Sequence, residues 1–282
     1  MPNRVRVAAI QLNSTDDLSA NLAACEQWLL EAKAAGARLA VLPENFAFFG
    51  PEARRIEHAE QLGDFNGPIQ SALKRLAKST QMAIVAGGWP EQSDEPARPY
   101  NALTVFDPEG AIAGHYRKLH LFDVDLANGT TYRESASTSA GGDVTVSTVV
   151  GINLGLSICY DLRFPELYRR LSELGAEVMC IPSAFTAETG RDHWHLLNRA
   201  RAVESQAWVI AANQWGSHGK NRQTYGHSLI IDPWGTVVAE ATDRPGIIVA
   251  DLDLDWLASI RARLPALRHR RLGIERLPTA PV

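Results

Sequence analysis

The chain has 282 residues, of which 45% are apolar and 21% are charged, and its formal net charge at pH 7 is −4. These proportions are typical of a soluble globular protein, and the length is enough to bury a large core. A net negative charge gives no general attraction to nucleic acid or to an anionic membrane, so we expect neither as a partner. Any anionic substrate must therefore be held by local arginine, lysine or histidine side chains.

Three cysteines, Cys25, Cys159 and Cys180, are odd in number and widely spaced. This usage argues against a disulfide framework and fits a reducing compartment. No signal-peptide core follows the N-terminus, and no apolar run is long enough to cross a bilayer. The sequence therefore predicts a cytoplasmic protein.

Apolar runs bounded by turn residues predict alternating strands and helices in the first half of the chain. Residues 5–12 are expected to form a central strand, followed by a helix that begins near Leu18 and ends at Gly36. The turn Asp107-Pro108-Glu109-Gly110 predicts a hairpin. Further strands are expected at 39–42, 82–86, 102–106 and 111–116, and a further helix at 69–78.

The second half repeats this order and closes on a similar turn, Asp232-Pro233-Trp234-Gly235. Strands are expected at 152–158, 178–181, 208–212, 228–231 and 236–239, and helices from Pro165 to Gly175 and over 193–205. Two open sheets packed face to face, with helices outside, would bury both sets of strands. We therefore predict an α/β fold, a four-layer α-β-β-α sandwich with two mixed sheets and an internal pseudo-repeat. No linker divides the chain, which favours a single domain over residues 1–282.

Two segments lie outside this pattern. Residues 128–142 are rich in Gly, Ser and Thr, but Tyr132, Arg133 and Glu134 within them favour a functional loop. The C-terminal segment 264–282 begins with a basic stretch that lacks periodicity, so we expect either a solvated tail or a tail docked on a partner subunit.

Cys159 stands between a predicted strand and the helix that begins at Pro165. A side chain at the carboxyl end of such a strand faces the crevice where α/β folds bind ligands. The nearby helix start is expected to favour the thiolate over the thiol. The alternative is an inert buried cysteine.

Glu44 and Lys118 also lie just past the ends of predicted strands, so both can converge with Cys159 on one crevice. Together the three groups suit acyl transfer, with the carboxylate as general base for the thiol. The ammonium and the Tyr160 backbone N–H would stabilise the oxyanion. Taken singly, Glu44 could cap a turn and Lys118 could be a solvated charge.

Three blocks resemble the signature motifs of the nitrilase, or carbon–nitrogen hydrolase, superfamily, in that family's order. They are Leu42-Pro43-Glu44-Asn45-Phe46, Tyr116-Arg117-Lys118-Leu119-His120-Leu121-Phe122-Asp123 and Cys159-Tyr160-Asp161-Leu162-Arg163-Phe164-Pro165-Glu166. The resemblance covers essentially the whole chain. It implies the four-layer sandwich and a Glu-Lys-Cys triad at Glu44, Lys118 and Cys159. It also implies that Glu134 helps to hold the lysine and to order the substrate.

Other stretches resemble the Nit group of amidases and, within it, most closely the deaminated glutathione amidases. They are Pro182-Ser183-Ala184-Phe185, Thr189-Gly190, His193-Trp194, Arg199-Ala200-Arg201-Ala202 and Tyr225-Gly226-His227-Ser228. True nitrilases carry Trp-Glu where this chain has Tyr160-Asp161. His195 departs from the family pattern, because relatives usually place Glu after His-Trp, and this change affects local packing or subunit contacts.

The resemblance implies hydrolysis of a linear amide through a thioester on Cys159. Deaminated glutathione would yield α-ketoglutarate and cysteinylglycine. The competing substrates are α-ketoglutaramate, cleaved by ω-amidases, and N-carbamoyl amino acids.

A substrate with a carboxylate at each end needs cationic or hydroxyl partners. Candidates are Arg133, Arg191, Tyr225 and His227, each of which also has a purely structural alternative. Residues 215–222 could line the pocket, with Lys220 or Arg222 near the terminal carboxylate, or could form a solvated hairpin loop.

Neither a metal nor an organic cofactor is expected, because Cys159, Cys180 and the histidines lack zinc-like spacing. We expect a homo-oligomer, at least a dimer, built on the Pro165 helix and the 193–205 helix, an expectation that the resemblance strengthens. Two rival function classes remain. A papain-like hydrolase would pair Cys159 with His120 or His227, and a non-enzymatic interaction protein would be expected to have lost part of the triad.

Overall fold

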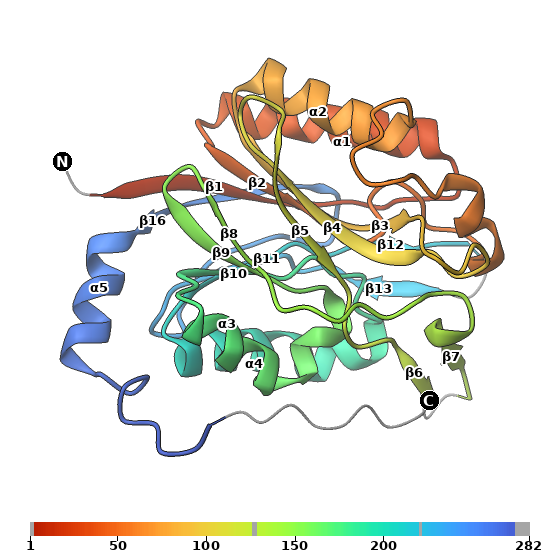
Figure 1. Ribbon diagram of the computed structural model, residues 1–282. Coiled ribbons are helices and arrows are strands. Elements are labelled where there is room, and N and C mark those ends of the chain that lie inside the picture. Colours follow the sequence, from red (N-terminus) through yellow and green to blue (C-terminus); the bar gives the residue numbers. More distant parts are fainter. Residues whose placement is uncertain (1–2, 126–128, 220–221, 274–282) are drawn as a thin grey trace.

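Two six-stranded sheets lie at the centre of the computed structural model, which describes residues 3–125, 129–219 and 222–273 (Figure 1). The first has the order β16 (Gly246–Asp253), β1 (Arg4–Gln11), β2 (Leu39–Leu42), β3 (Ala83–Glu91), β4 (Tyr100–Phe106), β5 (Ile112–Arg117). The second has the order β15 (Val237–Glu240), β14 (Leu229–Ile231), β11 (Trp208–Ala211), β10 (Val178–Cys180), β9 (Ile152–Leu156), β8 (Val146–Val149). Two small ribbons pair β6 (Asp123–Asp125) with β7 (Thr131–Arg133) and β12 (Trp215–Ser217) with β13 (Gln223–Tyr225).

Helices cover the outer faces of both sheets, which confirms the predicted four-layer sandwich. The first sheet is covered by α1 (Leu18–Ala34) and α2 (Pro68–Thr80), and the second by α3 (Pro165–Glu173) and α4 (Ala187–Ser205) (Figure 1). A fifth helix, α5 (Leu254–Arg263), follows β16, and three short 3-10 segments are η1 (Glu52–His58), η2 (Glu134–Ala136) and η3 (Cys159–Arg163). None of the described helices is both long and apolar enough to span a bilayer.

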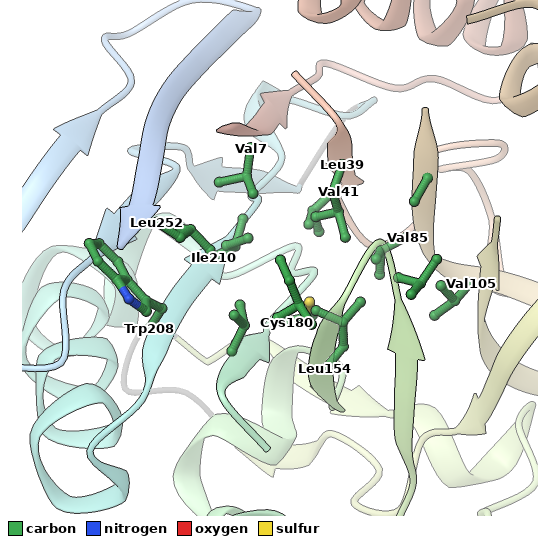
Figure 2. Packing of buried hydrophobic residues seen from close by; sticks show 14 of the residues in the cluster. Val7, Leu39, Val41, Val85, Val105, Leu154, Cys180, Trp208, Ile210 and Leu252 are labelled. Carbon is green, nitrogen blue, oxygen red and sulfur yellow. The ribbon is translucent and has the colours of Figure 1, made fainter. Parts of the chain in front are cut away.

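Alternation along the strands divides the apolar side chains between layers, because successive residues of a strand point to opposite faces. In β1, Val7 and Ala9 face the second sheet, whereas Ala8 and Ile10 pack under α1 and α2. Figure 2 shows the inner layer, in which Val41 and Val85 of the first sheet lie near Leu154 of the second. Burying each such side chain contributes about 1.5–3 kcal/mol, so this shared core ties the two halves together.

The predicted pseudo-repeat is present in the strand pairing. Strands β1, β2 and β3 are parallel, and β4 and β5 return as antiparallel neighbours. Strands β9, β10 and β11, followed by β14 and β15, repeat this arrangement. One strand in each sheet was not predicted from the sequence, β16 in the first sheet and β8 in the second. Each of these strands pairs antiparallel with the first strand of its repeat, β1 or β9. The repeat therefore has six strands rather than five.

Helix α4 begins at Ala187, six residues before the predicted start at residue 193. The reason is local, because the Thr186 side chain accepts a hydrogen bond from the Thr189 backbone N–H and caps the helix. The cap places the first turns of α4 beside the pocket described below, which Thr186 and Thr189 help to line.

The described part of the C-terminal segment packs on its own chain rather than extending into solvent. Arg270 Nη2 lies 2.7 Å from Glu173 Oε1, and Gln206 Nε2 donates to the Leu264 carbonyl over 2.7 Å. Both partners belong to the end regions of α3 and α4. The remainder of the expected tail, residues 274–282, lies outside the described residues, as do Asn128 of the predicted loop and Lys220.

Candidate active site

Cys159 occupies a sharp turn between β9 and η3. Its φ of 47° lies in the left-handed region, which is unusual for a residue with a side chain, and its backbone N–H donates to the Pro182 carbonyl over 2.9 Å. Strain of this kind persists where the surrounding structure fixes it, often at functional sites. The turn displays the thiol at the floor of a pocket.

Burial and the neighbouring Glu44 carboxylate raise the pKa of Cys159 well above its ordinary value, despite the opposing charge of Lys118. The prediction that the helix start favours the thiolate is therefore wrong. Helix α3 begins only at Pro165, after the short η3 segment, so its dipole is too distant to offset burial. The resting group is therefore a neutral thiol whose proton the nearby Glu44 carboxylate helps to retain.

Lys118 is buried between two carboxylates. Its Nζ donates to Glu44 Oε1 over 3.0 Å and to Glu134 Oε2 over 2.8 Å, and only 2% of the side chain is exposed. Burial alone would lower the pKa of Lys118, but the charges of Glu134 and Glu44 outweigh it and raise that pKa. The ammonium therefore stays charged.

Glu134 lies beside Lys118 as the resemblance implied. Burial acts to raise the pKa of Glu134, but the Lys118 ammonium outweighs it and holds that pKa below its ordinary value. The Phe122 backbone N–H also donates to Glu134 Oε2 over 2.7 Å. The carboxylate is thereby kept ionised and fixed in place.

Asn101, a residue that sequence reasoning missed, connects the two carboxylates. Its Nδ2 donates to Glu44 Oε1 over 2.9 Å and to Glu134 Oε1 over 3.1 Å. The Ala184 backbone N–H donates to Glu44 Oε2 over 3.0 Å, so both oxygens of Glu44 have donors. No signal in the sequence marks Asn101, because it lies within β4 and outside the three blocks.

The backbone around Glu44 depends on a glycine. Gly88 has a φ of +75°, and a Cβ at this position would lie 2.5 Å from Glu44 Cγ. Asn45, the residue after Glu44, has a φ of 58°, and its backbone N–H donates to the Gly88 carbonyl over 2.9 Å. A larger residue at position 88 would displace the Glu44 carboxylate.

The pocket above these groups has a volume of about 150 Å³. Its lining contains five cationic side chains and three carboxylates, so it is positive within a negatively charged protein. Tyr160 also lines it, in contact with Phe122 at a ring distance of 5.0 Å. The cations are Arg55, Lys118, Arg133, Arg163 and Arg222, and the carboxylates are Glu44, Glu52 and Glu134.

The structure brings only one of the four candidate substrate-binding residues to the pocket. Arg133 lines it while pairing with Asp125 at 2.8 Å. Arg191, Tyr225 and His227 are not among the described lining residues, which corrects the expectation for these three. Their side chains are engaged elsewhere: Arg191 is 71% exposed and pairs with Asp192, whereas Tyr225 stacks on His227, which pairs with Glu240. Arg222, named as an alternative, does line the pocket.

The papain-like alternative finds no support in these contacts. His120 Nδ1 lies 2.7 Å from Asp161 Oδ1, and its ring stacks on Phe164 with centroids 3.6 Å apart. His227 binds Glu240, as described above. No histidine lines the pocket among the described residues, so Glu44 is the base available to Cys159.

One cluster outside the pocket could hold a metal ion, formed by His195, His227 and Glu240. Glu240 Oε1 lies 2.9 Å from His195 Nε2 and 2.7 Å from His227 Nδ1. His195, which stands where relatives usually have Glu, therefore connects α4 to β15 through Glu240.

Comparison with known proteins places the chain in a family. The sequence model of the carbon–nitrogen hydrolase family matches residues 6–262. The chain belongs to the carbon–nitrogen hydrolase family. This carbon–nitrogen hydrolase is 45% identical over 267 residues to a Synechocystis protein named deaminated glutathione amidase, covering 93% of this chain and 97% of that protein.

Solved structures of the family have the same architecture. The hydrolase superposes on the Caenorhabditis elegans NitFhit protein with a TM-score of 0.89 and 35% identity, covering 95% of this chain and 65% of that longer chain. It superposes on Saccharomyces cerevisiae Nit3, described as a member of branch 10 of the nitrilase superfamily, with a TM-score of 0.86 and 33% identity. That match covers 95% of this chain and 97% of Nit3.

Proposed function

We propose that this hydrolase is a cysteine-dependent amidase that cleaves deaminated glutathione into α-ketoglutarate and cysteinylglycine. The observation that carries the proposal is that Glu44, Lys118 and Cys159 line one positive pocket, with Glu44 paired to Lys118 and its charge raising the pKa of the Cys159 thiol. The Synechocystis relative, named for this activity, supports the choice of substrate.

Acylation begins from the neutral thiol. Glu44 accepts the Cys159 proton as the sulfur attacks the amide carbonyl carbon, and a tetrahedral oxyanion forms. The Lys118 ammonium and the Tyr160 backbone N–H stabilise that oxyanion. Glu44 then returns the proton to the amide nitrogen, the carbon–nitrogen bond breaks, and cysteinylglycine leaves an α-ketoglutaryl thioester on Cys159.

Deacylation uses the same carboxylate. Glu44 removes a proton from a water molecule as the water oxygen attacks the thioester carbonyl carbon, and the carbon–sulfur bond then breaks. The proton passes back to the sulfur and restores the thiol. Glu134 supports both steps as a positioning residue, because it holds Lys118, which in turn contacts Glu44.

The positive pocket favours substrates with carboxylates over neutral amides. A panel of deaminated glutathione, α-ketoglutaramate and an N-carbamoyl amino acid, assayed on one preparation, tests the proposal. We expect the highest kcat/KM with deaminated glutathione, because its peptide tail adds binding energy that orients the scissile amide. A preference for α-ketoglutaramate would make the protein an ω-amidase, and carbon dioxide released with ammonia would make it a carbamoylase.

We also propose that the enzyme is a cytoplasmic homo-oligomer. Three side chains near one another support the oligomer: Leu196 and Val203 on α4 are 66% and 52% exposed, and Trp234 in the adjacent turn is 61% exposed. Arg199 on the same helix donates to the Gly235 carbonyl, which fixes that turn against α4. The three cysteines, none in a disulfide, support a reducing compartment.

A further inference from the structure

Arg55 is the most deeply buried of the arginines that line the pocket. It lies on η1, and only 6% of the residue is exposed. Its one ion-pair contact among the described residues is long, with Nη1 4.0 Å from Glu52 Oε2. A guanidinium removed from water in this way normally has most of its donors paired.

The unpaired donors of Arg55 form one edge of the guanidinium. Nε and Nη2 are both shielded from solvent and have no hydrogen-bond partner among the described residues. These two nitrogens present parallel N–H groups, the fork that matches the two oxygens of a carboxylate. Leaving such donors unpaired is costly, so a ligand that satisfies both would gain affinity.

The other arginines of the pocket are already engaged. Arg133 is 48% exposed at its side chain and pairs with Asp125, and Arg222 is 28% exposed and pairs with Glu52 at 2.9 Å. Arg163 Nη1 lies 3.3 Å from His193 Nδ1. Arg55 therefore differs from them in combining deep burial with a free pair of donors.

We propose that Arg55 binds the carboxylate at the acyl end of the substrate, the end that becomes the free α-keto acid. This inference rests on the proposed function and extends it, since neither the three motif blocks nor the contacts of the triad include Arg55. In the substrate complex the side chain rotates so that this fork, which is shielded from solvent in the free protein, takes the carboxylate in a two-point contact at the pocket that Arg55 lines.

The order of events favours the acyl end. Cysteinylglycine must leave before water attacks, whereas the acyl carboxylate stays in the pocket through both steps. A buried cation suits the group that stays, because a charge pair is stronger where water is excluded. The more exposed Arg133 and Arg222 suit the group that departs.

A competing explanation makes Arg55 a positioning residue for Glu134, because its charge contributes to lowering the pKa of that carboxyl. The two explanations differ in what they predict for a neutral substrate. A positioning role would affect every acyl transfer at Cys159. A carboxylate-binding role would affect only ligands that carry the acyl-end carboxylate.

The test measures binding of glutarate, a five-carbon dicarboxylate, by calorimetry to Cys159→Ala and to the same protein with Arg55→Gln. We expect Arg55→Gln to weaken the affinity by at least about 30-fold, as loss of one member of a buried charge pair does. Arg55→Lys keeps the charge but loses the fork, and should fall between the two. The matched control is Arg54→Gln, since Arg54 is the next residue, pairs with Asp16 and Glu57, and does not line the pocket.

A second measurement follows turnover of a neutral activated ester, p-nitrophenyl butyrate, by otherwise wild-type protein. The Arg55→Gln variant should retain this activity within about threefold and melt near the wild-type temperature. Equal loss of ester and dicarboxylate activity, or unchanged glutarate affinity, would overturn the inference. Glutarate binding through Arg55 in an enzyme that does not cleave deaminated glutathione would support the inference and overturn the proposed function.

Discussion

Lys118 holds a positive charge between Glu44 and Glu134, and that arrangement determines how Cys159 can react. Because burial and Glu44 keep the thiol protonated, the nucleophile is formed only when Glu44 takes its proton. The base must therefore be fixed within reach of the sulfur. The donors on both Glu44 oxygens, from Lys118, Asn101 and the Ala184 N–H, provide that fixation.

Replacing the nucleophile should abolish turnover without unfolding the protein. We expect Cys159→Ala to lower kcat by at least about 1,000-fold, because a covalent route is lost. Circular dichroism and thermal melting check that the fold remains. Residual activity near the wild-type level would show that the sulfur is not the nucleophile.

Alkylation should distinguish the three cysteines. Cys25 and Cys180 are fully buried, and burial raises the pKa of Cys180 to about 12, whereas Cys159 opens to the pocket. Iodoacetamide should therefore modify Cys159 first, with loss of activity in proportion, as peptide mapping can follow. Full activity after Cys159 is alkylated would contradict the assignment.

Two charge-removing variants should differ in stability although both inactivate the enzyme. Glu44→Gln leaves the Lys118–Glu134 pair intact and should fold normally. Lys118→Gln leaves two buried carboxylates facing each other, and breaking such a pair costs about 3–5 kcal/mol. Urea denaturation measures the difference, and equal stability of the two variants would argue against a charged Lys118.

Residues of this site could be predicted from the sequence where a short stretch of neighbouring residues marks them, and could not be predicted where only the tertiary fold brings them in. Glu44, Lys118 and Cys159 each come shortly after the end of a strand, β2 and β5 in the first sheet and β9 in the second, and a side chain in that place is typically exposed to a ligand crevice. Asn101 and Arg55 carry no such signal, because only tertiary packing brings Asn101 of β4 to Glu44 and Arg55 of η1 to the pocket. Arg191 was expected at the pocket, but α4 begins at Ala187 rather than at residue 193, and Arg191 on its first turns is exposed and pairs with Asp192.

At the scale of elements, Arg222, which immediately precedes β13, lines the pocket. The connection between β12 and β13 is anchored by His218, which is 7% exposed. Its Nδ1 donates to the Ser14 carbonyl over 2.8 Å, and its Nε2 lies 2.7 Å from Thr224 Oγ1. Burial of the ring favours its neutral form.

Acid should therefore destabilise this element. Burial lowers the pKa of His218 from 6.5 to about 4. Between these values the unfolded chain binds a proton that the folded chain does not, so stability falls as pH falls and is unaffected above pH 6.5. We expect a loss of about 2 kcal/mol between pH 7 and pH 5 from this residue. A His218→Gln variant, unfolded with urea at pH 7 and pH 5, should lose less free energy of unfolding than the wild-type protein by about that amount. The same pH dependence in both proteins would show that His218 is not the group responsible.

Secondary structure was predicted well where a local apolar pattern determines the element. It was predicted poorly where the element depends on pairing with a strand that is distant in the chain. Strand β2 and helix α3 match their expected ranges closely, because each combines an apolar pattern with a clear stop. Strand β16 was missed because its burial is partial and its partner, β1, lies more than 230 residues away in the chain. The Thr186 cap that starts α4 early depends on one side-chain contact.

For the whole molecule, the exposed apolar side chains of α4 predict the assembly. Leu196→Glu combined with Val203→Glu should convert an oligomer into a monomer, because both lie on the proposed contact face. Leu30→Glu is the matched control, since Leu30 is 50% exposed on α1, on the opposite side of the sandwich. Light scattering measures the mass, and a wild-type protein that is monomeric and fully active would contradict the proposal.

The two halves should also unfold together. We propose a single domain, supported by the core that both sheets share, with Val85 of one and Leu154 of the other in the same cluster. Thermal unfolding should then give one transition, whether followed by tryptophan fluorescence or by circular dichroism. Two separated transitions would indicate independent halves.

The central claim is that Cys159 carries the acyl half of deaminated glutathione during turnover. Rapid acid quench of the wild-type enzyme with this substrate, followed by mass spectrometry of the intact protein and its peptides, tests that claim directly. We expect one α-ketoglutaryl group per chain, located on the peptide containing Cys159 and absent from Cys159→Ala. Product formation with no adduct under conditions where deacylation limits the rate, or an adduct on another residue, would contradict it.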